Sequence, residues 1–216
     1  LVHCRRGTVN PVAVSLGVNI VPISEPVEDA GRPPVSLAEL IGAPVIFLIG
    51  SDLTVEHPVA GSFVKRAVLA GSSLVAVDER ETAIARHAKI FLRVRPGTEA
   101  ILVQGMIRLL LETGPRAAAL PRDVLKEMHA AVEAFPLERV ASATGVAAEE
   151  ITRAVEILGA GSSTMLLYGP RVAAWEREYV RLQDLLGNLN SAHGGVGGLG
   201  DLANSQGAAL LGLHPH

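Results

Sequence analysis

The sequence predicts an α/β protein, a Rossmann-like parallel β-sheet with helices on both faces. Short apolar runs at residues 45–49, 74–77 and 90–94 alternate with segments of helical periodicity. Each run ends in glycine or in a charged or hydroxyl side chain. Because the carboxyl ends of parallel strands meet at one edge of a sheet, we expect a ligand site where these runs end.

Composition narrows the class of protein. Of the 216 residues 49% are hydrophobic and 19% charged, which is typical of an ordered globular chain. The net charge of -3 and the 3% aromatic content argue against nucleic acid as a partner. The single cysteine, Cys4, excludes an internal disulfide, so we expect the cytoplasm. No apolar run reaches the roughly 18 residues of a membrane span, so direct membrane insertion is not expected.

The N-terminal segment carries weak local signals. The chain starts at Leu1 in mid-pattern, and we expect an excised piece of a longer polypeptide. Residues 8–16 fit either a helix or a strand. Residues 25–34 hold three prolines among charges and predict an exposed loop. Ser36 and Glu39 form a capping box for a short helix over residues 37–41.

The central segment predicts strand, helix, strand, short helix, strand. The first helix begins near Pro58, a residue suited to the first turn, and Gly71 ends it. A short helix precedes the run at 90–94. The next helix starts at Thr98 as N-cap, runs to Glu112 and is apolar almost all round, which predicts burial. The predicted apolar face of the first helix consists of Val59, Phe63, Val64, Ala67 and Val68.

The second half repeats this pattern. Helices are predicted over residues 123–134, 137–144 and 149–158. A further apolar run, Thr164–Tyr168, ends in Gly169-Pro170 and leads to a helix over 174–189. Residues 194–216 form a glycine-rich tail that we expect to lead towards a neighbouring domain.

Neither glycine turn predicts an ordinary NAD site. The first strand ends in Gly50-Ser51-Asp52, which is not the G-x-G-x-x-G fingerprint of dinucleotide-binding proteins. Residues 195–200 match that fingerprint, but a helix and no strand precedes them. We interpret them as a flexible or ligand-wrapping loop.

Several side chains near the strand ends have two interpretations. Asp78 lies where an acidic residue reaches a nucleotide ribose, and it also suits an N-cap for a helix starting at Arg80. His57 either caps its helix or lines the cleft beside Ser51. Arg95 precedes a helix N-terminus that can bind phosphate, although most such arginines are only solvated. Cys4, beside two arginines, is either an activated thiol or an inert small hydrophobe.

Four motifs follow one another along the central segment, namely GSDLTVEHPV, GSSLVAVDER, ARHAK and VRPGTE. In sequence and order they resemble the motifs of the molybdopterin oxidoreductases, in particular the formate dehydrogenase α subunits. The later GNLN…HGGV…ANSQGA is similar to a further family segment. The similarity spans about residues 46–215.

The resemblance implies a domain, residues 1–216, that binds the guanosine diphosphate part of molybdopterin guanine dinucleotide. The implied cofactor contacts are Gly50, Ser51, Asp52, Glu56, His57, Asp78, Arg80, Arg95, Gly97 and Thr98 around the nucleotide, and Tyr168, Gly169, Asn204 and Gln206 nearer the pterin. Cys4 would ligate molybdenum or tungsten and take part in catalysis. Iron–sulfur clusters are expected in other parts of the polypeptide.

Two departures from the family pattern keep a rival interpretation open. Arg5 stands where the family has a histidine, and the family's catalytic arginine falls near Leu199 or Gly200. The large iron–sulfur subunit of complex I (NADH dehydrogenase) has the same fold, usually without the metal site. The alternative is therefore a cofactor-free structural and electron-transfer domain. In either case the expected partners are the remaining domains of the subunit and other electron-transfer subunits, in a complex that is at most peripheral to a membrane.

Overall fold

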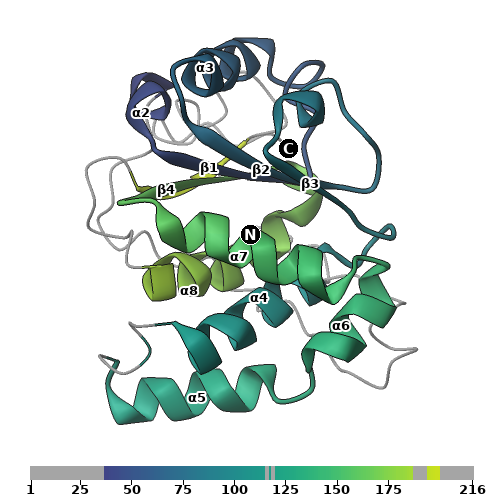
Figure 1. The fold of residues 1–216 in the computed structure, drawn as a ribbon, viewed down its shortest axis with the longest axis vertical. Helices are drawn as coiled ribbons and strands as arrows, with labels where there is room; N and C mark the ends of the chain where they lie inside the picture. The colour runs from purple at the N-terminus through teal and green to yellow at the C-terminus, as the bar shows by residue number, and fades with distance from the viewer. Residues whose placement is uncertain (1–36, 115–116, 118–119, 187–193, 200–216) are drawn as a thin grey trace, which may run out of the picture.

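A five-stranded parallel sheet forms the centre of the protein (Figure 1). The computed structural model describes residues 37–114, 117, 120–186 and 194–199. Within these residues the strand order is β3-β2-β1-β4-β5, with helices on both faces. This confirms the predicted Rossmann-like α/β fold. The strands are β1 (Val45–Ile49), β2 (Ser73–Asp78), β3 (Ile90–Arg93), β4 (Thr164–Tyr168) and β5 (Gly195–Gly198).

The register of the sheet aligns the strand ends. Ile49 at the end of β1 lies opposite Val77 on one side and Tyr168 on the other. Gly50 and Gly169 therefore leave the sheet at the same edge at which β2 ends in Asp78. Because β1 continues to β2 on one side and has β4 on the other, the order reverses between β1 and β4, where Rossmann-like sheets bind ligands.

Two helices cover one face of the sheet, α2 (Leu37–Gly42) and α3 (Pro58–Leu69) (Figure 1). Val64 and Ala67 of α3 are fully buried in the core on this face. The prediction that Val59 joins them is wrong, since 62% of its surface is exposed. Gly61 packs so closely on the backbone of Leu53 that an added Cβ would lie 2.9 Å from the Leu53 carbonyl oxygen. The face with Gly61 therefore points inward and Val59 points outward.

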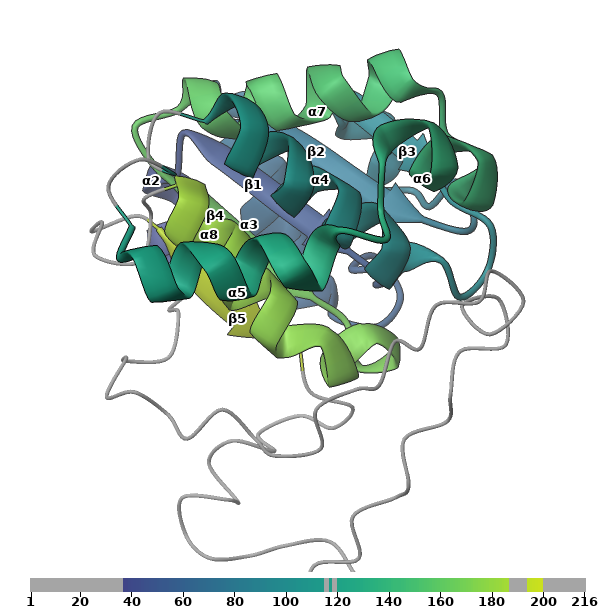
Figure 2. The ribbon, with the colours of Figure 1, turned by 90° about the horizontal axis from the view of Figure 1, so that it is seen from below.

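The opposite face carries two layers of helices. In the first, α7 (Ala148–Ala160) and α8 (Glu176–Leu186) contact the sheet, and α4 (Glu99–Thr113) packs against both. In the second, α5 (Arg122–Val132) and α6 (Leu137–Thr144) cover α4, as Figure 2 shows from below. Helix α4 thus has neighbours on all sides, which explains its apolar composition and confirms its predicted burial.

The C-terminal part corrects two predictions. A 3₁₀ helix, η3 (Pro170–Trp175), follows β4, so the helix predicted from residue 174 begins at Glu176. Residues 195–198, expected as a loop, form β5 beside β4. The buried Gln183 amide on α8 donates to the carbonyls of Thr164 and Gly195, at 3.0 and 3.1 Å, and so ties both strands to the helix. This long-range anchor leaves no signal in the local sequence.

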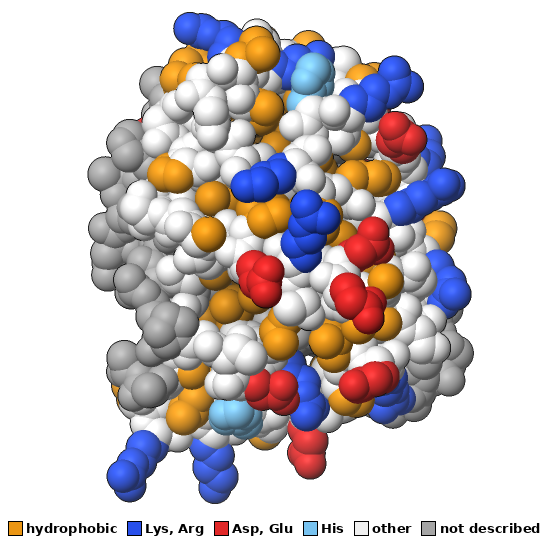
Figure 3. Space-filling model, in the orientation of Figure 1, with side chains coloured by type: hydrophobic (Ala, Val, Ile, Leu, Met, Phe, Trp, Pro, Cys, Tyr) orange, Lys and Arg blue, Asp and Glu red, His pale blue; other side chains and the backbone are white. Residues whose placement is uncertain are grey.

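The surface carries charges of both signs. Figure 3 shows acidic and basic side chains interspersed over the face that is seen in Figure 1. Among the described helices none is long and apolar enough to cross a bilayer.

Candidate functional site

The turn after β1 is closed by its own carboxylates. Glu56 accepts hydrogen bonds from the Ser51 hydroxyl at 2.7 Å and from the Asp52 backbone N–H at 3.2 Å. Asp52 in turn accepts the backbone N–H of Thr54 at 3.1 Å. The turn starts at Gly50, whose φ of +67° is a conformation that favours glycine. These polar contacts make the β1 turn a compact acidic loop.

The turn after β4 lies directly against it. The Gly169 N–H donates to the Ile49 carbonyl at 2.9 Å. A Cβ on Gly169 would lie 2.1 Å from the Gly50 carbonyl oxygen, closer than any real contact. Only glycine therefore permits this approach, and the two turns form the floor of the strand-order reversal.

Arg171 reaches from the β4 turn across the end of β1 to the end of β2. Its guanidinium donates to Asp78 Oδ2 at 3.0 Å and to Glu79 Oε1 at 3.2 Å. The other oxygen of Asp78, Oδ1, accepts the Arg80 backbone N–H at 3.1 Å. Both carboxylate oxygens of Asp78 are thus bound by the chain itself, and Asp78 is buried.

These contacts correct one interpretation of Asp78. It holds a turn and does not cap a helix, because the next helical segment, η1 (Ala85–His87), starts later in the chain. There, Thr82 Oγ1 accepts the Ala85 N–H at 3.3 Å.

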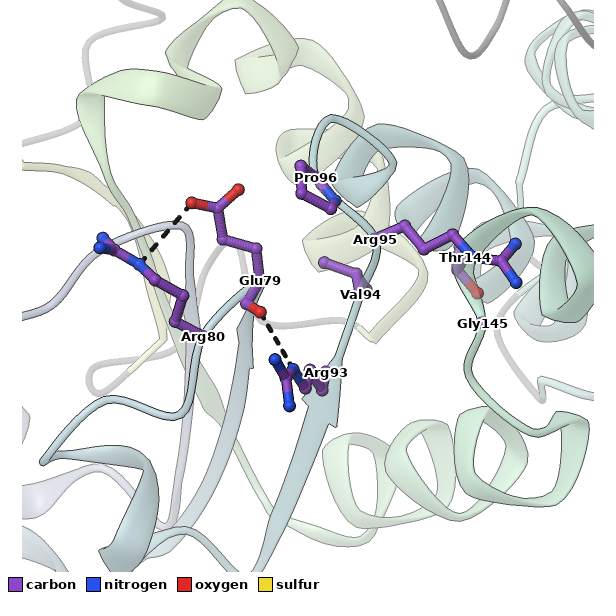
Figure 4. A pocket seen from close by; sticks show the side chains of 8 residues that line it. All are labelled: Glu79, Arg80, Arg93, Val94, Arg95, Pro96, Thr144 and Gly145. Carbon is purple, nitrogen blue, oxygen red and sulfur yellow. Dashed lines mark hydrogen bonds and ion pairs between the residues drawn. The ribbon is translucent and has the colours of Figure 1, made fainter.

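An arginine-lined pocket of about 580 Å³ opens beside this cluster (Figure 4). The Glu79 carboxylate forms one wall and pairs with Arg80 at 3.7 Å. Arg93 Nε donates to the Glu79 backbone carbonyl at 3.2 Å, and Figure 4 shows the two residues side by side. The full lining consists of Glu79, Arg80, Arg93, Val94, Arg95, Pro96, Thr144 and Gly145. Such a lining suits an anionic ligand.

Arg95 connects the pocket to α6. Its guanidinium donates to the carbonyls of Ser142 and Ala143 at the C-terminal end of that helix. Its own carbonyl accepts the Thr98 hydroxyl at 2.7 Å, and Thr98 is fully buried. The turn passes through Gly97, whose φ is +77°. Arg95 and Thr98 thus stabilise this wall, and their predicted contact with the nucleotide stays a prediction.

A buried acid lies below the cluster. Glu99, the first residue of α4, is almost fully buried, and desolvation raises the pKa of its carboxyl above the ordinary value of 4.5. Arg171 acts in the opposite direction, while the carboxylates of Glu79 and Asp78 raise the pKa further. Burial likewise raises the pKa of Tyr179, whose hydroxyl donates to the Val172 carbonyl at 3.0 Å.

The structure gathers the described candidate residues at one edge of the sheet. His57 is at the N-cap of α3 but makes no side-chain capping bond. Tyr168 is buried against Tyr179, with ring centroids 5.0 Å apart. Cys4, Asn204 and Gln206 lie outside the described residues. Among the described residues, no group of three or more His, Cys, Asp or Glu side chains is arranged so that it could hold a metal ion.

The sequence analysis missed Arg171 and the buried acid Glu99. Arg171 had one available signal, namely a charged residue directly after the Gly-Pro turn that ends an apolar run. Its partners are Asp78, the last residue of β2, and Glu79, which follows it. Because Asp78 precedes Arg171 by 93 residues, no local sequence pattern could have indicated this pairing. Thr144 and Gly145 of the pocket come from a helix end for which no functional signal exists.

Comparison with known proteins gives three informative matches. F420-dependent formate dehydrogenase 1 subunit alpha of Methanococcus maripaludis is 25% identical over 99% of this chain and 32% of its own length. Formate dehydrogenase H of Escherichia coli is 26% identical over 83% of this chain and 26% of its own length. The solved structure of acetylene hydratase from Pelobacter acetylenicus matches 74% of this chain and 23% of its own, with 25% identity and a TM-score of 0.54. No protein-family model matches the sequence.

The fold and its aligned strand ends define a Rossmann-like α/β domain. The chain is a homologue of the molybdopterin oxidoreductases, which confirms the resemblance carried by its motifs. It spans about a third or less of the length of the curated relatives that it matches.

Proposed function

We propose that the chain is the cofactor-binding domain of a molybdopterin-dependent oxidoreductase most like formate dehydrogenase, and that it binds the guanosine diphosphate part of molybdopterin guanine dinucleotide. The observation that carries this proposal is the arginine-lined pocket at the ends of β2 and β3, whose Glu79 also pairs with Arg171 from the β4 turn. The matched relatives include two formate dehydrogenases, which supports formate as the substrate of the whole enzyme.

The residues at the sheet edge fit an anionic dinucleotide. The glycines at 50 and 169 let the two turns pack closely, since an added Cβ would meet the Val172 side chain at Gly50 and the Gly50 carbonyl oxygen at Gly169. The arginines offer donors to phosphate oxygens, and the acidic β1 turn offers acceptors to ribose hydroxyls and base N–H groups. Gly50, Ser51, Asp52, Glu56 and His57 would hold the cofactor on the β1 side. Tyr168-Gly169 would hold it on the β4 side.

The bound metal–pterin would supply the redox chemistry, with molybdenum or tungsten and with Cys4 as a ligand. The role of this chain is to bind and orient. We further propose that the rest of the polypeptide, together with iron–sulfur clusters and electron-transfer subunits, completes the enzyme in the cytoplasm. One relative is itself named as an alpha subunit, which supports partner subunits.

Equilibrium binding to the full 216-residue chain tests the nucleotide assignment. Isothermal titration calorimetry with GDP, ADP and NAD should show GDP as the tightest ligand. Tight NAD binding without GDP binding would overturn the proposal. For the whole polypeptide, metal analysis and formate-dependent dye reduction test the enzyme assignment.

The rival is a cofactor-free domain like that of the complex I subunit. The engagement of both Asp78 oxygens by Arg171 and by the Arg80 amide is the observation that favours it, since these contacts occupy the group expected to meet a ribose. A whole polypeptide that contains neither molybdenum nor tungsten, and a chain that binds no GDP, would decide for this alternative.

A further inference from the structure

Arg171 occupies the position where a Rossmann-like sheet places its ligand. It starts from the β4 turn, two residues after Gly169, and its guanidinium ends at Asp78 and Glu79 beyond β2. Since β1 lies between β4 and β2 in the sheet, the side chain crosses above the end of β1. Its side chain keeps 39% of its surface exposed, whereas that of Asp78 keeps 4%. Arg171 therefore faces solvent and Asp78 lies beneath it.

The β1 turn uses several of its backbone N–H groups for contacts within the turn. In many dinucleotide sites, backbone N–H groups of a glycine-rich turn and the following helix N-terminus bind the phosphates. Here, the N–H groups of Asp52 and Thr54 donate to carboxylates of the turn itself. Those of Val55 and Glu56 donate to the Asp52 carbonyl. A phosphate near β1 would meet carboxylates, so a cation must come from elsewhere.

The Arg171 guanidinium is a cation at this position. A guanidinium carries five N–H donors, and the ion pairs with Asp78 and Glu79 fix its plane without using all of them. Asp78 is itself fixed through its other oxygen by the Arg80 amide. The carboxyl groups that face Arg171 are those of Asp78, Glu79 and Glu99, while Arg80, Arg93 and Arg95 line the adjoining pocket. The guanidinium groups of these three arginines offset the negative charge of the carboxyl groups.

We propose that Arg171 is the phosphate-binding residue at the strand-order reversal, and that Asp78 positions Arg171 and does not itself bind the ribose. This inference rests on the proposed function, because it names the group that holds the diphosphate of that nucleotide. The sequence suggested that Asp78 contacts the ribose, whereas this proposal makes Asp78 the residue that positions Arg171.

The test uses the full 216-residue chain with inorganic pyrophosphate, GDP and guanosine as probes in isothermal titration calorimetry. Arg171→Ala should weaken the binding of pyrophosphate and of GDP about ten- to a hundredfold, because charge-assisted hydrogen bonds are lost. Guanosine, which has no phosphate, should bind within about twofold of the wild type. The control Arg177→Ala removes the same charge from a residue that pairs with Glu127 on α5, and it should leave all three affinities unchanged.

A second variant distinguishes a folding defect from a loss of phosphate binding. Arg171→Ala leaves Asp78 buried without its guanidinium, so circular dichroism must show a folded chain. The double variant Asp78→Asn/Arg171→Ala removes that unpaired carboxylate and should bind as weakly as Arg171→Ala alone. Asp78→Asn alone should weaken GDP binding about threefold, as expected of a positioning residue, and leave guanosine binding unchanged. If Asp78→Asn weakens guanosine binding tenfold, Asp78 binds the ribose and the inference is wrong.

The outcomes separate this inference from the proposed function. A wild type that binds GDP and an Arg171→Ala variant that binds it equally well overturn the inference alone. Arg171-dependent binding of pyrophosphate, with GDP no tighter than ADP, supports the inference and overturns the guanine assignment. A wild-type chain that binds neither pyrophosphate nor GDP overturns both.

Discussion

The turns after β1 and β4 begin alike and have opposite chemistry. Each follows a fully buried strand of five residues and begins with a glycine, Gly50 or Gly169. In the first turn, the carboxylate of Glu56 binds the chain back onto itself. In the second, the guanidinium of Arg171 reaches to another strand. The backbone sets the position of each turn, whereas a charged side chain further along the turn, Glu56 in the first and Arg171 in the second, sets its charge.

The difference has a consequence for the ligand site. A closed acidic loop and an exposed cation lie next to each other at the strand-order reversal, so the site offers acceptors on one side and donors on the other. Ligands with phosphates at one end and hydroxyl or N–H groups at the other match such a division.

The largest effect is expected from filling the contact between the two turns. Gly169→Ala places a Cβ 2.1 Å from the Gly50 carbonyl oxygen, and the backbone must move. We expect a loss of about 3 kcal/mol in the free energy of unfolding, measured by urea titration. Gly159→Ala is the matched control, because nothing lies within 4 Å of its added Cβ. This control should be neutral or stabilising by up to about 1 kcal/mol. Equal losses in both variants would mean that the turns are not in contact.

Removing the cation of the β4 turn should have the next largest effect. Arg171→Ala leaves the buried Asp78 carboxylate unpaired, and we expect a loss of about 2 kcal/mol, less than for a fully buried pair because Arg171 is partly exposed. The double variant Asp78→Asn/Arg171→Ala should recover at least half of this loss in the same urea titration. A single variant as stable as the wild type would show that the ion pair contributes nothing.

The carboxylate of the β1 turn should matter less, since Glu56 is exposed. Glu56→Ala removes the acceptor for the Ser51 hydroxyl and the Asp52 N–H, and we expect a loss of about 1 kcal/mol. Glu156→Ala, an exposed acid on α7, should change the stability by less than about 0.5 kcal/mol. If both variants behave alike, the Glu56 contacts do not close the turn.

The smallest effect is expected at Glu99, where it depends on pH. Burial raises the pKa of this carboxyl, so the folded chain binds more protons than the unfolded chain above pH 4.5. Its contribution to stability is complete below that pH and is lost as the pH rises through the folded-state pKa. Glu99→Gln should therefore raise the melting temperature relative to the wild type at pH 7, and this gain should vanish towards pH 4.5. A difference that does not change with pH would contradict the assignment.

Local signals in the sequence predicted most of the elements. The first apolar run gave both bounds of β1, and Pro58 gave the first residue of α3. The glycine and charged residues after each run mark the edge of the sheet at which we propose that the ligand binds. These signals worked because burial, proline geometry and glycine conformation act within a few residues of chain.

Other features arise only from contacts between distant segments. Val59 fits the apolar stripe of its helix, yet the close approach of Gly61 to Leu53 turns it to solvent. The glycines of β5 have low strand propensity, and the Gln183 amide and the ladder with β4 hold them in the sheet.

The sequence by itself thus determined the Rossmann-like order of strands and helices and the family resemblance, and it indicated the sheet edge at which we propose that a ligand binds. Tertiary structure decided which side chains meet at that edge. Arg171 and Asp78 are separated by 93 residues, and their 3.0 Å contact depends on the order of β2, β1 and β4 in the sheet. The physical reason is that short-range patterns fix burial and backbone direction, while the pairing of charges depends on positions in space that only the folded sheet brings together.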